Sequence, residues 1–134
     1  MKSFDTLKDL HVTLDKDRPG TLAKAATAIA NAGVNIEGFC EIDGQFHTVT
    51  GDAPVAKRAL ESAGYKVHEM DVVVFPAEDR PGFLADTLKR ITDDEINVSV
   101  AYTLTNTRIA IGADQVSKLK GALQEFATTA ARSR

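Results

Sequence analysis

Cysteine is almost missing from this chain, because Cys40 is the only one in 134 residues. A disulfide within the chain is therefore excluded, and a reducing compartment fits the composition best. Long apolar runs are missing too, since residues 1–5 lead into charged residues rather than a hydrophobic stretch. The sequence predicts neither a signal peptide nor a membrane span, so we expect a cytoplasmic protein with no membrane partner.

A surplus of basic charge is likewise absent. The chain has 16 Lys and Arg residues against 19 Asp and Glu residues, which gives a net charge of −3, and both signs are spread along the sequence. A protein that binds nucleic acid usually carries a strong basic excess on one face. We therefore expect no nucleic-acid partner.

Signals for catalysis and metal binding are scarce. The histidines His11, His47 and His68 are dispersed and lack a further ligand at the spacing of a metal site, so we expect structural roles for them. Cys40 has no motif around it and is most simply a small core residue. The sequence shows no Ser-His-Asp arrangement, no phosphate-binding glycine-rich loop and no pair of catalytic carboxylates. We predict that the chain is not an enzyme and uses no cofactor and no metal.

What the sequence does contain is an internal repeat. The segment 17–20 (Asp-Arg-Pro-Gly) returns at 79–82, a shift of 62 positions. A repeat of this length indicates a duplicated small domain rather than a solenoid, and units this small are expected to share a buried interface. We therefore predict two domains, 1–70 and 71–134. Further identities at the same shift are Leu22 with Leu84, Ala23 with Ala85, Ile29 with Ile91, Asn35 with Asn97, and Asp52 with Asp114.

The residue pattern of the first domain predicts the order βαββαβ. Alternating or short apolar segments indicate strands at 10–14, 34–42, 46–50 and 65–69, and Asp43-Gly44 is typical of a hairpin turn. Apolar residues at helical spacing indicate helices at 22–32 and 52–63. This is the ferredoxin-like order, in which four antiparallel strands carry two helices on one face.

The second domain repeats this order without its last strand. Strands are predicted at 72–75, 96–104 and 109–111, and helices at 83–91 and 114–130. The strand at 72–75 is apolar on both faces, so we expect it to be buried on both sides. Its edge must be covered by residues 65–70, by the N-terminal residues or by another chain, and on this ground we expect a homodimer. The predicted fold class is α+β, with two tandem ferredoxin-like (βαββαβ) units whose sheets are antiparallel, the second lacking a clear last strand.

The repeated turn is suited to binding a small anion. Gly20 and Gly82 each precede a predicted helix, whose first N–H groups have no partner within the helix and whose dipole favours negative charge. A carboxylate is the natural guest. Asp17 or Asp79 can pair with an ammonium group, so the turn suits a free α-amino acid. The alternative is that each Asp only satisfies amides of its own loop, as Asp does in common turns.

The sequences around both turns resemble the ACT domain family. The resemblance rests on 17–23 (Asp-Arg-Pro-Gly-Thr-Leu-Ala) with 32–36 (Ala-Gly-Val-Asn-Ile), and on 79–85 (Asp-Arg-Pro-Gly-Phe-Leu-Ala) with 96–98 (Ile-Asn-Val). It covers nearly the whole chain as two copies. The family consists of small-molecule sensor modules, most often for amino acids, attached to biosynthetic enzymes, stringent-response synthetases or transcription regulators. Two modules typically pack side by side and bind ligand at their interface.

The resemblance implies two ligand sites, each joining the loop of one module to the second strand of the other. Asn35 and Asn97 open these strands, although both can equally serve only as caps. Thr21 is small and polar where Phe83 is large and apolar, so we expect unequal sites, with the Gly20 site the better receptor if Phe83 fills its own pocket. One implied site combines Asp17, Arg18, Gly20, Thr21 and Leu22 with Asn97, Val98 and Ser99; the other combines Asp79, Arg80, Gly82, Phe83 and Leu84 with Asn35, Ile36 and Glu37.

Three functions stay open at this point. The favoured one is a stand-alone tandem ACT protein that binds a free amino acid and passes that state allosterically to a regulated enzyme or a transcription factor. The second is a regulatory subunit of an amino-acid biosynthetic enzyme such as acetolactate synthase, whose small subunit opens with a similar module. The third is a small enzyme of the dimeric α+β barrel type, which requires a polar or cofactor-lined cavity between helices and sheet.

Overall fold

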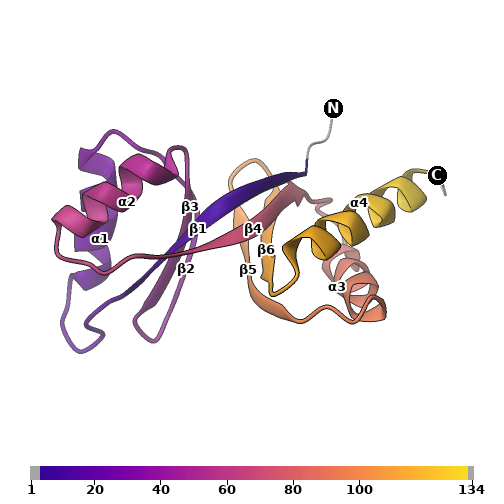
Figure 1. Cartoon of the computed structure of the whole chain (residues 1–134), viewed down its shortest axis with the longest axis horizontal. Coiled ribbons are helices and arrows are strands. Elements are labelled where there is room, and N and C mark those ends of the chain that lie inside the picture. Colours follow the sequence, from indigo (N-terminus) through magenta and orange to yellow (C-terminus); the bar gives the residue numbers. More distant parts are fainter. Residues whose placement is uncertain (1–3, 133–134) are drawn as a thin grey trace. The chain divides into compact units, whose positions relative to one another are not determined.

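The computed structural model describes residues 4–132 (Figure 1). Most predicted helices and strands occur close to their expected positions, but the first strand, expected at 10–14, begins five residues earlier. The strands expected at 65–69 and 72–75 are replaced by one continuous strand that begins at His68. In chain order the elements are β1 (Asp5–Thr13), α1 (Thr21–Asn31), β2 (Ile36–Ile42), β3 (Gln45–Thr50), α2 (Ala53–Ser62), β4 (His68–Pro76), α3 (Phe83–Asp93), β5 (Val98–Leu104), β6 (Arg108–Ala113) and α4 (Val116–Arg132).

The sheet corrects the predicted fold class. Its strands follow the order β1-β3-β2-β5-β6-β4 in one closed barrel. The chain is therefore α+β with one closed sheet, and the prediction of two tandem ferredoxin-like units, each with its own sheet, is wrong. The reason lies in β4, because Asp71 interrupts the apolar run and makes one strand look like two in the sequence. With the two segments joined, the first repeat has no separate fourth strand.

Contacts nevertheless divide the chain into two compact units. One unit is Lys8–Met70, and the other joins Met1–Leu7 to Asp71–Arg134. The strands β1 and β4 each begin in one unit and end in the other.

In the Lys8–Met70 unit, β3 pairs with β1 on one side and β2 on the other, both antiparallel. The helices α1 and α2 lie side by side against one face of these strands (Figure 1). Asp52 caps α2, since its carboxylate accepts a hydrogen bond from the Val55 N–H at 3.2 Å. The hydrophobic core consists of Leu10, Val12, Leu14, Ala25, Ile29, Phe46, Ala56 and Leu60.

In the other unit, β6 pairs with β4 and β5, again antiparallel. The helices α3 and α4 pack together, and the Arg90 guanidinium lies 2.9 Å from the Glu125 carboxylate between them. The Phe4 ring stacks on Phe75, with centroids 5.8 Å apart and planes within 6°. The buried core consists of Val73, Phe75, Ile91, Ile96, Ile109, Ile111, Ala113, Leu119, Ala122 and Leu123.

The segment 72–75 is buried on both faces, with exposed fractions of 0–2%, which confirms the prediction. It pairs with β6 through Val73 opposite Ile111, and the closed order puts β1 on its other side. The first residues of β1 belong to the same unit as this segment. The N-terminal residues thus cover the edge of this strand. An uncovered edge therefore no longer argues for a dimer, and the homodimer stays an untested prediction.

None of the helices in the described part of the chain has the length and apolar character that crossing a membrane requires.

The two cores predict matched losses of stability. Ile29 and Ile91 occupy equivalent positions in α1 and α3 and are 0% and 1% exposed. Replacing either by Ala is expected to lower the free energy of unfolding by about 2–5 kcal/mol, because buried methyl groups are lost and a cavity is left. Urea denaturation followed by circular dichroism measures the change.

Ile42→Ala is the matched control, since Ile42 is 73% exposed. It is expected to change the free energy of unfolding by about 1 kcal/mol or less. A loss at Ile42 as large as that at Ile29 or Ile91 would contradict the assigned cores.

Candidate functional site

The first repeated turn ends in a left-handed glycine. Gly20 has φ 87° and stands directly before α1 without any side-chain cap. Its carbonyl accepts the first helical hydrogen bond, from the Lys24 N–H at 2.9 Å. A side chain at Gly20 would strain this backbone, since L-residues rarely adopt such a φ. The helix therefore begins with uncapped N–H groups at Thr21 and Leu22.

Asp15, rather than Asp17, holds this loop together. The Asp15 carboxylate accepts a hydrogen bond from the Asp17 N–H at 3.1 Å, and its carbonyl accepts one from the Thr21 hydroxyl at 3.1 Å. The loop amide is thus satisfied by a residue outside the repeated motif. Asp17 itself is exposed, and Arg18 is only loosely tied to Asp15, at 4.0 Å. The repeat did not predict this role of Asp15, because the residue at the equivalent position of the second copy is Ala77.

The second repeated turn has the same backbone and different contacts. Gly82 has φ 86° and stands before α3, again without a side-chain cap. Here the arginine is engaged: Arg80 lies 2.6 Å from the Glu78 carboxylate and 3.7 Å from that of Asp86. Its guanidinium also lies over the Phe83 ring, 5.5 Å from the centroid. Phe83 packs partly against the core of its unit.

Charge is reversed at two positions around the repeated motif. Lys16 in the first copy corresponds to Glu78 in the second, and Lys24 corresponds to Asp86. Asp86 lies in the first turn of α3, whereas α1 has no acidic residue there. An acid in the first turn already satisfies part of the helix dipole and repels an incoming anion. The Gly20 turn is therefore the more favourable of the two for a carboxylate.

A β-bulge occurs at the same place in both second strands. The register of β2 against β3 shifts between Ile36 and Gly38, and that of β5 against β6 shifts between Val98 and Val100. The extra residues are Glu37 and Ser99, which correspond in the repeat. Bulges re-aim side chains and are frequent beside binding sites.

The remaining predicted strand residues lie around these bulges. Asn35 and Asn97 are both exposed, and the Asn35 carbonyl accepts a hydrogen bond from the Gly51 N–H at 2.9 Å. Ile36 is half-buried, and Val98 and Ser99 are exposed. Nothing in the structure tests whether the helix residues and the strand residues of either predicted site come together. Both sites stay predictions.

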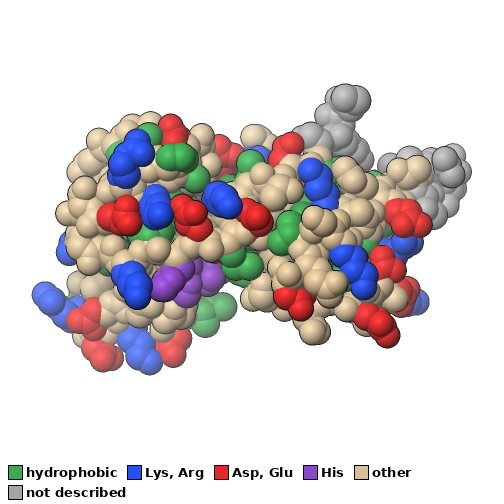
Figure 2. Space-filling model, in the orientation of Figure 1, with side chains coloured by type: hydrophobic (Ala, Val, Ile, Leu, Met, Phe, Trp, Pro, Cys, Tyr) green, Lys and Arg blue, Asp and Glu red, His purple; other side chains and the backbone are tan. Residues whose placement is uncertain are grey.

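Histidines that are scattered in the sequence gather on one face of the Lys8–Met70 unit (Figure 2). His11 on β1 lies opposite His47 on β3, and their rings stack with centroids 4.1 Å apart and planes within 8°. The His68 ring lies 5.9 Å from that of His11. The sequence analysis missed this cluster because it depends on the register between distant strands.

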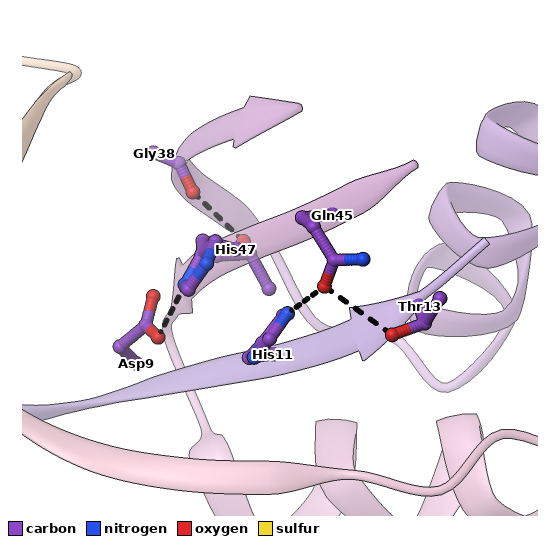
Figure 3. Close-up of polar contacts among 7 residues, drawn as sticks. Asp9, His11, Thr13, Gly38, Gln45 and His47 are labelled. Carbon is purple, nitrogen blue, oxygen red and sulfur yellow. Dashed lines mark hydrogen bonds and ion pairs between the residues drawn. The ribbon is translucent and has the colours of Figure 1, made fainter. Parts of the chain in front are cut away.

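Two further groups flank the histidines. Asp9 is fully buried, and its carboxylate accepts a hydrogen bond from His47 Nδ1 at 2.9 Å (Figure 3). Cys40 on β2 lies opposite His47 and is half-buried. Burial, and then the nearby Asp9 charge, raise the pKa of the Cys40 thiol. Within the described residues, no set of three or more His, Cys, Asp and Glu side chains is arranged to hold a metal ion.

Comparison with known proteins shows the fold. No family model and no curated protein sequence matches the chain. A protein from Bacteroides thetaiotaomicron has a similar structure, with a TM-score of 0.74 and 23% identity over 90% of this chain and 88% of that one. The regulatory subunit of aspartate kinase from Thermus thermophilus is also similar, with a TM-score of 0.68 and 18% identity over 92% of this chain and 94% of that one. The corresponding subunit from Thermus flavus has a TM-score of 0.65 and 17% identity over 93% of this chain and 95% of that one. The chain has the ACT-like fold of these regulatory subunits.

The environment of Cys40 predicts slow alkylation that Asp9 helps to maintain. A raised pKa leaves less thiolate at pH 7–8, and the thiolate is the reactive form. Asp9→Asn removes one of the causes that raise the pKa, so iodoacetamide is expected to modify Cys40 faster in this variant. Mass spectrometry of the intact protein over time gives both rates.

Asp93→Asn serves as the control, because Asp93 is an exposed aspartate of the other unit. It is expected to leave the alkylation rate unchanged. An Asp9→Asn protein that keeps its circular dichroism spectrum but reacts no faster than the wild type would rule out the electrostatic effect.

Proposed function

We propose that the chain is a regulatory protein without catalytic activity of its own, which binds a free α-amino acid. The supporting observation is an uncapped helix N-terminus behind a left-handed glycine, present twice in one ACT-like fold. Structural neighbours of nearly the same length are named as regulatory subunits of aspartate kinase, which supports a regulatory role.

The ligand carboxylate is assigned to the start of α1. The N–H groups of Thr21 and Leu22 are the first of the helix and face outward from it. They and the positive end of the helix dipole favour a negative charge by up to about 2 kcal/mol in partly buried geometry. Lys24 and Arg18 add positive charge to this turn, whereas the first turn of α1 has no acid to compete.

The ligand ammonium group is assigned to Asp17. Because Asp15 accepts the hydrogen bond of the loop amide, the exposed Asp17 carboxylate is not needed for the turn. A carboxylate beside an ammonium group forms a charge-assisted hydrogen bond, which is stronger than a neutral one. The bulged strand starts, with Asn97, Val98 and Ser99 or with Asn35, Ile36 and Glu37, are assigned to recognition of the rest of the ligand.

The second turn is assigned a weaker role. Arg80 is held by Glu78 and Asp86, and Asp86 occupies the first turn of α3. Among Gly82, Phe83 and Leu84, the Phe83 N–H already donates to the Arg80 carbonyl at 3.4 Å, so this turn offers fewer free amides in a more acidic setting. The Asp79 site is expected to bind the same class of ligand less tightly than the Asp17 site.

The output is assigned to a protein partner, either a regulated enzyme or a transcription regulator. A regulatory subunit of a biosynthetic enzyme is the closer alternative, because the Thermus subunits are matched over 94% and 95% of their length. The small-enzyme alternative is disfavoured, since apolar side chains fill the cores between helices and strands in both units.

A thermal-shift screen of the twenty amino acids tests ligand binding. An amino acid that binds only the native state raises the apparent stability, so at least one is expected to raise Tm in a concentration-dependent way. Glu61→Ala, at an exposed position of α2, should give the same shift as the wild type. No shift with any amino acid at millimolar concentration would argue against the proposed function.

The inequality of the two turns is tested with the amino acid found in that screen. Asp17→Ala is expected to weaken the tighter binding by about 1–3 kcal/mol, the cost of a lost charged hydrogen bond. Asp79→Ala is the matched variant and should leave the tighter binding within about twofold of the wild type. Isothermal titration calorimetry reads both affinity and stoichiometry. Two equal, independent sites, or equal effects of the two variants, would contradict the assignment.

A further inference from the structure

A row of side chains crosses three paired strands of the Lys8–Met70 unit. Cys40 on β2 lies opposite His47 on β3, and His47 lies opposite His11 on β1. Residues directly opposite on antiparallel strands have Cβ atoms about 4.5–5.5 Å apart and point to the same face. His68 lies beside this row, with its ring near that of His11. None of these residues belongs to the repeated turns.

His47 is held in one orientation by a buried carboxylate. Its Nδ1 donates to Asp9, at 2.9 Å, and Asp9 is 0% exposed (Figure 3). A carboxylate that fixes one imidazole nitrogen leaves the other, Nε2, with its lone pair available. This pairing of a carboxylate with the far side of an imidazole is the usual support of a metal-binding histidine, because it fixes the tautomer and the orientation of the ring.

His11 is oriented from its other end. Its Nε2 lies 2.5 Å from the Gln45 side-chain oxygen, which also accepts a hydrogen bond from the Thr13 hydroxyl at 3.3 Å. The amide oxygen accepts, so Nε2 of His11 carries the proton and Nδ1 carries the lone pair. Both stacked rings therefore present an unprotonated nitrogen in their neutral forms.

We propose that His11 and His47 form a two-imidazole site for a divalent transition-metal ion such as Zn²⁺, with Asp9 as the outer partner of His47. Imidazole nitrogen is a preferred ligand of Zn²⁺, Cu²⁺ and Ni²⁺. The described residues contain no arrangement of three such ligands, so water completes the coordination. At a Zn–N distance of about 2.0–2.1 Å, two tetrahedral ligand atoms stand about 3.3 Å apart. The two rings are within 8° of parallel, so their lone pairs do not converge in this arrangement. Binding therefore requires His11 to give up its hydrogen bond to the exposed Gln45 and turn toward the ion, while His47 keeps its hydrogen bond to Asp9.

The neighbours of the pair are assigned no metal bond. His68 is exposed and not in the cross-strand register of His11 and His47. Cys40 lies on β2, on the other side of His47 from His11, so it does not border the space between the two imidazoles. These two residues therefore provide matched control variants on the same face.

Zinc titration of the untagged full-length chain tests the proposal. Isothermal titration calorimetry with Zn²⁺ alone is expected to show one ion per chain. Loss of an outer partner typically lowers metal affinity roughly 10- to 100-fold. His11→Gln and His47→Gln each remove a direct ligand, so each is expected to lower the affinity for Zn²⁺ by at least that much. Asp9→Asn, which keeps both imidazoles, is expected to fall within that 10- to 100-fold range.

The controls separate this site from adventitious zinc binding. His68→Gln and Cys40→Ser are each expected to bind Zn²⁺ within about twofold of the wild type. Asp9 is buried, so the Asp9→Asn result is interpreted only for protein whose metal-free thermal unfolding matches that of the wild type. The variant His11→Gln, at a half-buried position, tests the site independently. Absence of stoichiometric binding, an undiminished affinity in His11→Gln, or a tenfold loss in His68→Gln or Cys40→Ser would overturn the proposal.

Discussion

Backbone pairing of β4 is the constraint on which the rest of the structure depends. Its segment 72–75 is buried on both faces, so an open edge there would leave buried N–H and C=O groups without partners. The second copy of the repeat has no last strand to supply them. The structure meets the requirement by closing the sheet, with β6 on one side of β4 and β1 on the other. Two long strands that belong to both units are the result.

The same pairing places the chemically interesting side chains. Because β1 lies beside β3, Asp9, His11 and His47 come together on the face that the helices do not cover. The duplicated turns, in contrast, are set by local sequence and share one backbone geometry. Duplication has thus preserved the backbone of the turns while the charges around them have diverged, with Lys24 in one copy and Asp86 in the other.

Features determined by neighbouring residues could be predicted from the sequence. The periodicity of the helices, the Asp43-Gly44 hairpin and the special backbone at Gly20 and Gly82 all follow from short segments. The burial of 72–75 follows as well, since an apolar residue at every position needs cover on both sides.

Features determined by distant residues could not be predicted. The closed sheet depends on the pairing of segments far apart in the chain, and alternation within a strand carries no information about its partner. The histidine cluster depends on the register between β1 and β3 for the same reason. In the candidate site, the repeat identified Asp17, which has an aspartate counterpart in the other copy. It could not identify Asp15, which has none, although the Asp15 carboxylate accepts the hydrogen bond of the loop amide.

The stacking of Phe4 on Phe75 has a consequence for dividing the protein. A gene cut after residue 70 would follow the sequence repeat, yet it would remove Phe4 and the start of β1 from the unit that they complete. The C-terminal fragment would then carry an apolar strand with one bare edge, which is a template for aggregation. A circular permutant that begins just before β4 and rejoins the old termini through a linker would keep this strand whole and both of its neighbours in one chain. The repeat boundary in the gene and the folding boundary in the protein are therefore different places.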